Sequence, residues 1–136
     1  MDIKSLMIGD WVYNKHHNKN IQITPYDFFT HTHNEFGEQS LSPHSKPIFG
    51  MDLEPIPITP KILEKNGFRI IFEGELHKTY FQDIYDFAVE IKIDCIGFTK
   101  LSMSNGLDYM VVIECKHIHQ FQHALKLCGI NKEIEL

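Results

Sequence analysis

The most constraining feature of the sequence is a segment in its middle, residues 55–68, which contains the start and stop signals of a short helix. Thr59 belongs to the residue types that cap helix N-termini, and Pro60 fits a first helical turn, where no amide donor is needed. Gly67 can adopt the left-handed conformation that ends a helix. The sequence therefore predicts a short helix that begins at Pro60 and stops before Gly67.

Apolar residues on both sides of this helix have the spacing of contacts that fix its two ends. Ile58 precedes the capping residue, and Phe68 follows the glycine stop. We expect both side chains to pack on Leu63, one from each end of the helix. This pattern describes architecture and indicates no chemical reaction.

The residues before the helix predict a small antiparallel β structure. Residues 8–13 and 21–23 are rich in aromatic and β-branched side chains and flank a polar turn, as two paired strands would. We expect residues 1–56 to be the half of the chain that forms a small SH3-like antiparallel β-barrel. Residues 30–50 contain few apolar residues but several histidines and prolines, which predicts an irregular stretch.

The residues after the helix predict an antiparallel sheet. Residues 69–72 form a short apolar run, and residues 87–94 alternate between apolar and polar side chains, as in a half-buried strand. Asn105 and Gly106 form the preferred two-residue turn of a β-hairpin and separate two further apolar runs. We therefore expect a hairpin with a two-residue turn at this position.

The chain closes with a predicted helix from about His117. Its apolar stripe includes Phe121 and Leu125, and Gly129 follows as its stop. The whole pattern predicts an α+β fold in which this helix packs on the antiparallel sheet. At 136 residues the chain is long enough for a single domain, with possible sub-units at residues 1–56 and 57–136.

Composition disfavours several partners and environments. The formal net charge is −5 and Arg69 is the only arginine, so a surface for nucleic-acid phosphates is disfavoured. No apolar run approaches the roughly 18 to 20 residues that span a bilayer, and the N-terminus lacks the pattern of a signal peptide. Three cysteines without C-x-x-C spacing favour reduced thiols. We therefore expect a soluble cytoplasmic protein with no membrane partner.

Nine histidines are the unusual element of the composition, and two groups have spacings that zinc could use. His31 and His33 would lie on one side of an extended strand, and His119 and His123 share one face of a helix. Neither pair has the glutamate of an H-E-x-x-H motif, and Lys126 lies in the same helical sector as the second pair. A polar loop and a solvated helix face are the alternative interpretation. We expect no cofactor, with zinc at these histidines as the alternative.

The sequence contains no G-x-S-x-G elbow, no Walker phosphate loop and no G-x-G-x-x-G turn. Cys95, Cys115 and Cys128 each lie in or beside an apolar pattern, which indicates small buried side chains and not nucleophiles. We therefore name no catalytic residue and expect a protein without enzymatic activity.

Aromatic and basic residues in the N-terminal region form a candidate interaction surface, namely Trp11, Tyr13, Lys15, Lys19 and Tyr26. Such aromatic side chains either present a platform on which bases or a partner stack, or fill the core of a small barrel. Nucleic-acid binding through this surface is therefore one alternative function.

Three regions of the chain resemble a family of small proteins from gut-bacterial (Bacteroides-type) phages and mobile elements. The resemblance rests on residues 8–12, on residues 55–68 and on residues 118–125. The family has no assigned biochemical activity, so the resemblance implies a genomic setting and no catalytic residue. Its pattern places a His-Gln pair at the start of the last helix, which falls on His119 and Gln120, with Gln122 following. We expect these polar groups to dock the helix to backbone amides of the sheet.

Together these observations favour a noncatalytic interaction or accessory module of a phage or mobile element, with another protein as its partner. Nucleic-acid binding through the aromatic N-terminal sheet is one alternative. A histidine-based metal site, used in structure or hydrolysis, is the other.

Overall fold

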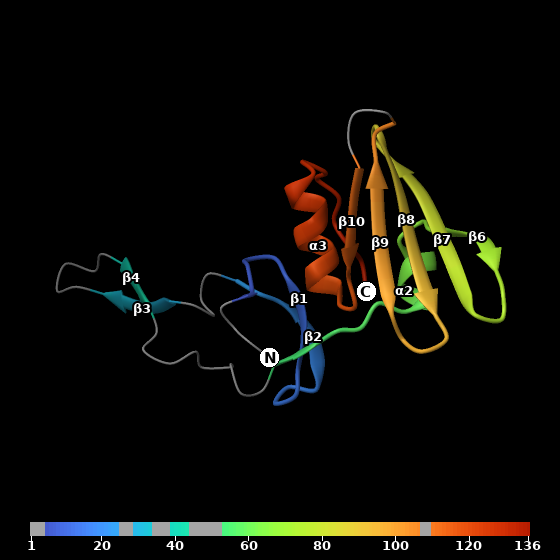
Figure 1. Cartoon of the computed structure of the whole chain (residues 1–136). Coiled ribbons are helices and arrows are strands. Elements are labelled where there is room, and N and C mark those ends of the chain that lie inside the picture. Colours follow the sequence, from blue (N-terminus) through green and yellow to red (C-terminus); the bar gives the residue numbers. More distant parts are fainter. Residues whose placement is uncertain (1–4, 25–28, 34–38, 44–52, 107–109) are drawn as a thin grey trace. The chain divides into compact units, whose positions relative to one another are not determined.

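The computed structural model describes residues 5–24, 53–106 and 110–136, together with the backbone of residues 29–33 and 39–43. The chain divides into two compact units, residues 1–56 and 57–136. Antiparallel sheets occur in both units, and the described α-helices lie in the second (Figure 1). The α+β class that the sequence predicts is confirmed.

The first unit contains a three-stranded antiparallel sheet of β1 (Trp11–Asn14), β2 (Lys19–Gln22) and β5 (Leu53–Pro55). The central strand is β1, so the strand order is β2-β1-β5. The β1–β2 turn contains Asn18, whose φ of 52° lies in the left-handed region that asparagine tolerates. The predicted pair of N-terminal strands is therefore present, joined through the polar turn.

Among the described residues of the first unit, a hydrophobic core cluster contains the buried residues Leu6, Val12, Ile23 and Leu53, with Ile21 packed against them. The strands β3 (Phe29–His33) and β4 (Gln39–Pro43) pair only with each other, as a separate two-stranded ribbon. The described strands of this unit thus form an open sheet and a ribbon without a closed barrel, and the SH3-like barrel is not confirmed.

The second unit is built on a five-stranded antiparallel sheet in which each strand pairs with the next along the chain. The strands are β6 (Arg69–Glu73), β7 (His77–Ile84), β8 (Phe87–Asp94), β9 (Thr99–Ser104) and β10 (Met110–Glu114). Their spatial order is β10-β9-β8-β7-β6, so β6 and β10 are the edge strands. The sequence predicts four of these strands, and β7 was missed.

The helix α2 (Pro60–Lys65) begins and ends as its sequence predicts. The Ile62 amide donates to Thr59 Oγ1 at 3.3 Å, which is the expected N-cap hydrogen bond. At the other end Gly67 has φ +89°, and the Phe68 amide donates to the Leu63 carbonyl at 3.0 Å. This bond and the one from the Gly67 amide to the Glu64 carbonyl form a Schellman motif.

The helix α3 (Ile118–Leu127) has the same type of C-terminal end. Gly129 has φ +72°, and the Ile130 amide donates to the Leu125 carbonyl at 2.9 Å. The buried positions of the helix include Ile118, Phe121 and Leu125, the stripe that the sequence predicts. None of the described helices is long and apolar enough to cross a bilayer.

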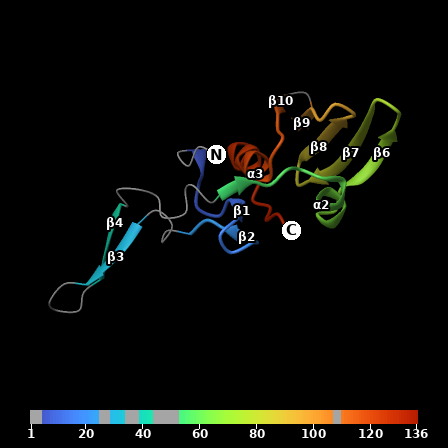
Figure 2. The ribbon, with the colours of Figure 1, turned by 90° about the horizontal axis from the view of Figure 1, so that it is seen from below.

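Both helices cover the same face of the five-stranded sheet (Figure 2). That face contributes buried side chains from three strands, β7, β8 and β9: Tyr80, Ile84, Val89, Ile91, Leu101 and Met103. The rings of Phe68 and Phe121 meet edge to face with centroids 5.9 Å apart, which links the end of α2 to α3. The opposite face of the sheet carries polar and charged residues such as Glu90, Lys92 and Lys100.

The predicted two-residue turn between β9 and β10 is wrong. Ser104 pairs with Met110, so five residues, 105–109, connect the two strands. Asn105 is not among the described residues with positive φ, although the predicted turn requires positive φ at both central positions. Instead, Ser104 Oγ accepts a hydrogen bond from the Gly106 amide at 3.2 Å. This local side-chain bond favours a wider loop.

Candidate functional site

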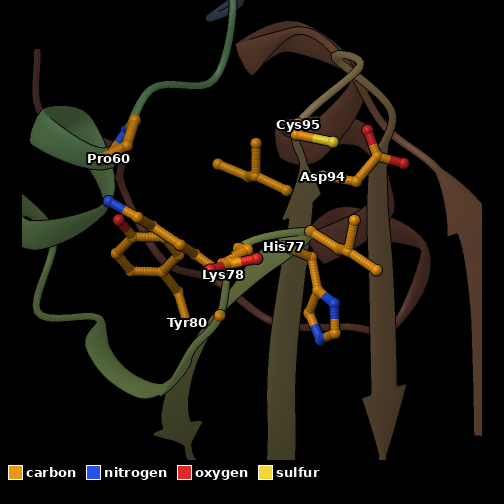
Figure 3. A pocket seen from close by; sticks show the side chains of 10 residues that line it. Pro60, His77, Lys78, Tyr80, Asp94 and Cys95 are labelled. Carbon is orange, nitrogen blue, oxygen red and sulfur yellow. The ribbon is translucent and has the colours of Figure 1, made fainter.

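A hollow of about 250 Å³ lies on the second unit, where the β6–β7 turn meets the end of β8 and the start of α2 (Figure 3). We call it the β7–β8 hollow. Its lining residues are Pro60, Gly74, Glu75, Leu76, His77, Lys78, Tyr80, Ile93, Asp94 and Cys95. Segments from three parts of the second unit therefore meet at this site.

Backbone hydrogen bonds hold the two turns beside the hollow together. The Gly74 amide donates to the His77 carbonyl at 3.0 Å, which closes the β6–β7 turn. The Cys95 amide donates to the Leu76 carbonyl at 2.8 Å and so ties this turn to the end of β8. A Cβ atom on Gly74 would lie 2.8 Å from the Phe72 ring, so a larger residue there requires this ring to move.

The Asp94 side chain shapes the second turn. Its Oδ1 accepts hydrogen bonds from the Phe98 amide at 2.8 Å and from the Ile96 amide at 3.1 Å. Gly97 within this turn has φ +91°, a conformation that favours glycine. The Asp94 carboxylate therefore has a structural role at the rim of the hollow.

The interior of the hollow is mainly apolar. Pro60, Leu76 and Ile93 contribute aliphatic surface, and the Tyr80 side chain is 1% exposed. Burial raises the pKa of Tyr80 above its usual value, so this phenol stays neutral near neutral pH. In contrast, Leu76 is 73% exposed. A large apolar side chain at the mouth of an apolar hollow is the arrangement of a contact surface.

The charges around the hollow are mostly acidic. Glu75 and Asp94 line it, and neither forms an ion pair with a basic group in the part of the chain that the structure describes. Lys78 forms an ion pair with Glu73 at 3.3 Å, so its positive charge is largely offset within β6 and β7. The rim is therefore net negative.

Cys95, His77 and Asp94 all line the hollow but are not arranged for nucleophilic catalysis. The His77 ring stacks on Phe72 with centroids 4.6 Å apart, and Figure 3 shows this ring pointing away from the Cys95 side chain. The Asp94 carboxylate is engaged by turn amides. A base that contacts the thiol and an acid that orients the base are both required for this chemistry. The described site lacks that geometry.

The cysteine predictions are correct only in part. Cys115 is fully buried, and burial raises the pKa of its thiol to about 12. Cys128 is half-buried, whereas Cys95 is exposed. The expectation of a buried Cys95 is wrong because β8 ends at Asp94, and Cys95 belongs to the turn and not to the alternating strand.

The predicted aromatic surface lies in the first unit and is only partly described. Trp11 and Tyr13 are two residues apart on β1, so they share one face, and both are half-buried. Lys15 forms an ion pair with Glu54 at 2.6 Å, and Lys19 is exposed at the start of β2. Tyr26 lies outside the described residues.

The two histidine pairs with spacings that zinc could use lie in different units, one on β3 and the other on α3. His31 and His33 belong to β3, and their side chains lie outside the described part of the structure. On α3, His119 is buried and His123 is half-buried, with ring centroids 5.8 Å apart. The interpretation of this pair as a solvated helix face is therefore wrong for His119. Among the described residues, no group of three or more His, Cys, Asp or Glu side chains is placed to hold a metal ion.

The polar residues at the start of α3 contact the backbone there. Gln120 Oε1 accepts hydrogen bonds from the Lys116 amide at 2.9 Å and from the His117 amide at 3.1 Å. The Lys116 carbonyl in turn accepts a hydrogen bond from the amide of Ile58, in the segment before α2, at 2.9 Å. Gln122, two positions on, is buried.

The β7–β8 hollow was missed from the sequence because β7 was missed. Along β7 only Tyr80 and Ile84 are buried and most other residues are half-buried, so the alternation that marks a strand is weak. A signal existed in the two turn sequences, Glu73-Gly74-Glu75 and Asp94-Cys95-Ile96-Gly97, which end β6 and β8, the two strands on either side of β7.

Comparison of the chain with known protein-family models, curated protein sequences and solved structures found no match.

Proposed function

We propose that this chain is a noncatalytic cytoplasmic module that binds another protein by taking one of its apolar side chains into the β7–β8 hollow. The observation that carries the proposal is the apolar lining of the hollow beneath an exposed leucine, Leu76. Large exposed apolar side chains at a concave surface favour a protein contact.

The size of the hollow supports a side chain as its occupant. Pockets for small molecules and cofactors usually enclose about 300–1,000 Å³. At about 250 Å³ the β7–β8 hollow is smaller than these pockets, but it has room for one large aliphatic or aromatic side chain. Full burial of such a side chain contributes about 1.5–3 kcal/mol. A short peptide is therefore expected to bind weakly, and the natural partner must add further contacts.

The negative charge of the rim indicates which residues of the partner would lie beside the inserted side chain. Glu75 and Asp94 are acidic and Lys78 is already paired with Glu73, so basic residues next to the inserted side chain would be complementary. Exposed ion pairs contribute little affinity, but they select partners and speed association. The expected partner segment is a large apolar residue flanked by lysine or arginine.

The proposal is tested by an NMR titration with short peptides. The probes contain one leucine or phenylalanine flanked either by two lysines or by two glutamates. We expect the lysine-flanked peptides to shift the amide resonances of residues 74–78 and 93–95, and the glutamate-flanked peptides to have a smaller effect. Leu76→Asp should abolish the shifts, whereas Leu127→Asp, at a leucine on α3 that is also largely exposed, should leave them unchanged. Shifts that are equal for both peptide types, or unchanged by Leu76→Asp, would reject the site.

The family resemblance remains part of this proposal. An accessory protein of a phage or mobile element would act by binding another protein of that element or of its host, which agrees with the absence of a catalytic array in the described site. An SH3-like character of the first unit also remains a proposal. If the gene lies outside any phage or integrated element, the resemblance is accidental.

Nucleic-acid binding is a second candidate, because Trp11 and Tyr13 share one face of β1 and are half-exposed. Against it, Glu54 offsets the charge of Lys15. A salt-dependent mobility shift with single-stranded oligonucleotides that Trp11→Ala abolishes would favour this function.

Metal binding by His119 and His123 also remains a prediction, and an unchanged unfolding temperature on titration with zinc would count against it.

A further inference from the structure

The two edges of the five-stranded sheet differ in how they are protected against pairing with another strand. The β6 edge has a register shift between Ile70 and Phe72 and carries a charged residue at each end, Arg69 and Glu73. Bulges and charges are the features that block edge-to-edge pairing. β10 pairs with β9 in unbroken register from Met110 to Glu114 and contains no lysine, proline or bulge. In the part of the chain that the structure describes, no strand pairs with its outer edge.

We infer that β10 pairs antiparallel with β10 of a second copy of this chain, centred on Val112, so that the two five-stranded sheets become continuous. The surface lies on the edge of the sheet opposite β6, whereas the β7–β8 hollow involves β7, β8 and α2. This self-association is therefore a property in addition to protein binding at the hollow.

The β10 sequence is complementary to itself in this register. Val112 lies opposite Val112 of the second copy, and Val111 lies opposite the second copy's Ile113. At each end of the strand pair, Met110 of one copy lies opposite Glu114 of the other. Met110, Val112 and Glu114 share the open face of the sheet, whereas Val111 and Ile113 share the helix-covered face, so each pair joins residues of the same face.

The charges permit this pairing. Glu114 is the only charged residue of β10, and in the β9–β10 register it lies opposite Lys100 of its own chain. The two Glu114 side chains of the dimer would be four residues apart along the strands, roughly 13 Å, where screening is strong. Met110 and Val112, which are 69% and 44% exposed, would be covered by the second copy. No like charges lie directly opposite each other.

A pairing of five residues on each strand is small. Stable protein interfaces usually bury about 1,200 Å² or more, and a single strand pair buries less. The dimer is therefore weak and its population depends on protein concentration. Backbone hydrogen bonds provide most of its affinity, as in other cases of strand addition to a sheet edge, and the side chains specify the register.

Sedimentation velocity across a dilution series of the full chain tests the dimer. We expect the average mass to rise with concentration for the wild type and for Ile71→Lys, and to remain that of the monomer for Val112→Lys. Ile71 is a matched control because it is 49% exposed on the other edge strand. Unfolding temperatures of both variants establish that they are folded. A wild type that is monomeric at every concentration, or a dimer that survives Val112→Lys, overturns the inference.

Disulfide crosslinking tests the register and does not depend on the lysine variants. Directly opposed residues of antiparallel strands have Cα atoms about 4.5–5.5 Å apart, within the range that a disulfide bridges. In a Cys95→Ser background, which removes the exposed thiol, Val112→Cys should form a covalent dimer under mild oxidation. Met110→Cys should not, because its equivalent in the second copy is four residues away. Crosslinking by Met110→Cys alone, or by neither variant, contradicts the proposed pairing.

Discussion

Asn66 fastens the C-terminal segment to the end of α2, and replacing it by aspartate should destabilise the second unit strongly. Its side chain is buried and makes three hydrogen bonds with the backbone. Nδ2 donates to the Ile62 carbonyl at 2.8 Å and to the Glu135 carbonyl at 2.7 Å, and Oδ1 accepts from the Glu135 amide at 2.7 Å. Asn66→Asp keeps the shape and the acceptor but removes both donors.

The cost follows from the number of bonds lost. Each hydrogen bond contributes about 1 kcal/mol net, and a buried carbonyl left without a donor costs more. A carboxylate would also face two carbonyl oxygens. We expect a loss of about 2–4 kcal/mol in the free energy of unfolding, or a fall of several degrees in the unfolding temperature. Because the two carbonyl oxygens disfavour the charged form in the folded state and protonation restores one donor, the deficit should shrink as pH falls toward the pKa of an ordinary aspartate, about 4.

Urea unfolding followed by far-UV circular dichroism measures this loss. The matched control is Asn131→Asp at an exposed position, which should change stability by less than about 0.5 kcal/mol. Hydrogen exchange of the Glu135 amide gives a local readout, and its protection should fall in Asn66→Asp. If Asn66→Asp and Asn131→Asp unfold alike and the Glu135 amide stays protected, the account of the C-terminal segment is wrong.

Three further predictions concern thiols, acid stability and the cap of α2. Cys95 should react quickly with a thiol reagent in the native protein, whereas Cys115 should react only on unfolding. In the folded protein the pKa of Cys115 is raised to about 12 from 9.0, so the stability of the fold should decline as pH rises from about 9 to 12. Burial and the charge of Lys116 lower the pKa of His117 below 6.5, so the unfolded state binds the proton more readily than the folded state. The free energy of unfolding should therefore fall as pH decreases through 6.5, and this fall should be smaller in His117→Gln. Thr59→Ala should cost about 1 kcal/mol in urea unfolding, whereas Thr59→Ser should cost little.

The sequence predicts local structure well where backbone geometry favours a few residue types. Thr59 caps α2 as predicted because its hydroxyl can accept a hydrogen bond from the Ile62 amide, and Gly67 and Gly129 take the positive φ that glycine adopts readily at helix ends. The β9–β10 turn was mispredicted for a related reason. Asn105-Gly106 is compatible with a two-residue turn, but the Ser104 hydroxyl competes for the Gly106 amide.

The candidate site could not be predicted in the same way. It depends on β7, whose alternation is weak, and on contacts such as the bond from the Cys95 amide to the Leu76 carbonyl, which joins two turns that are distant in sequence. The burial of His119 also depends on which face of α3 meets the sheet. These features depend on tertiary packing. Their only signal in the local sequence is the pair of turns around Gly74 and Gly97.

The most direct test of the proposed function is a set of intermolecular nuclear Overhauser effects between the protein and a lysine-flanked leucine peptide. If the leucine enters the β7–β8 hollow, its methyl groups should give cross-peaks to the methyl groups of Leu76 and Ile93 and to the ring of Tyr80. Cross-peaks only to Trp11 and Tyr13, or to none of these residues while the peptide is bound, would contradict the account.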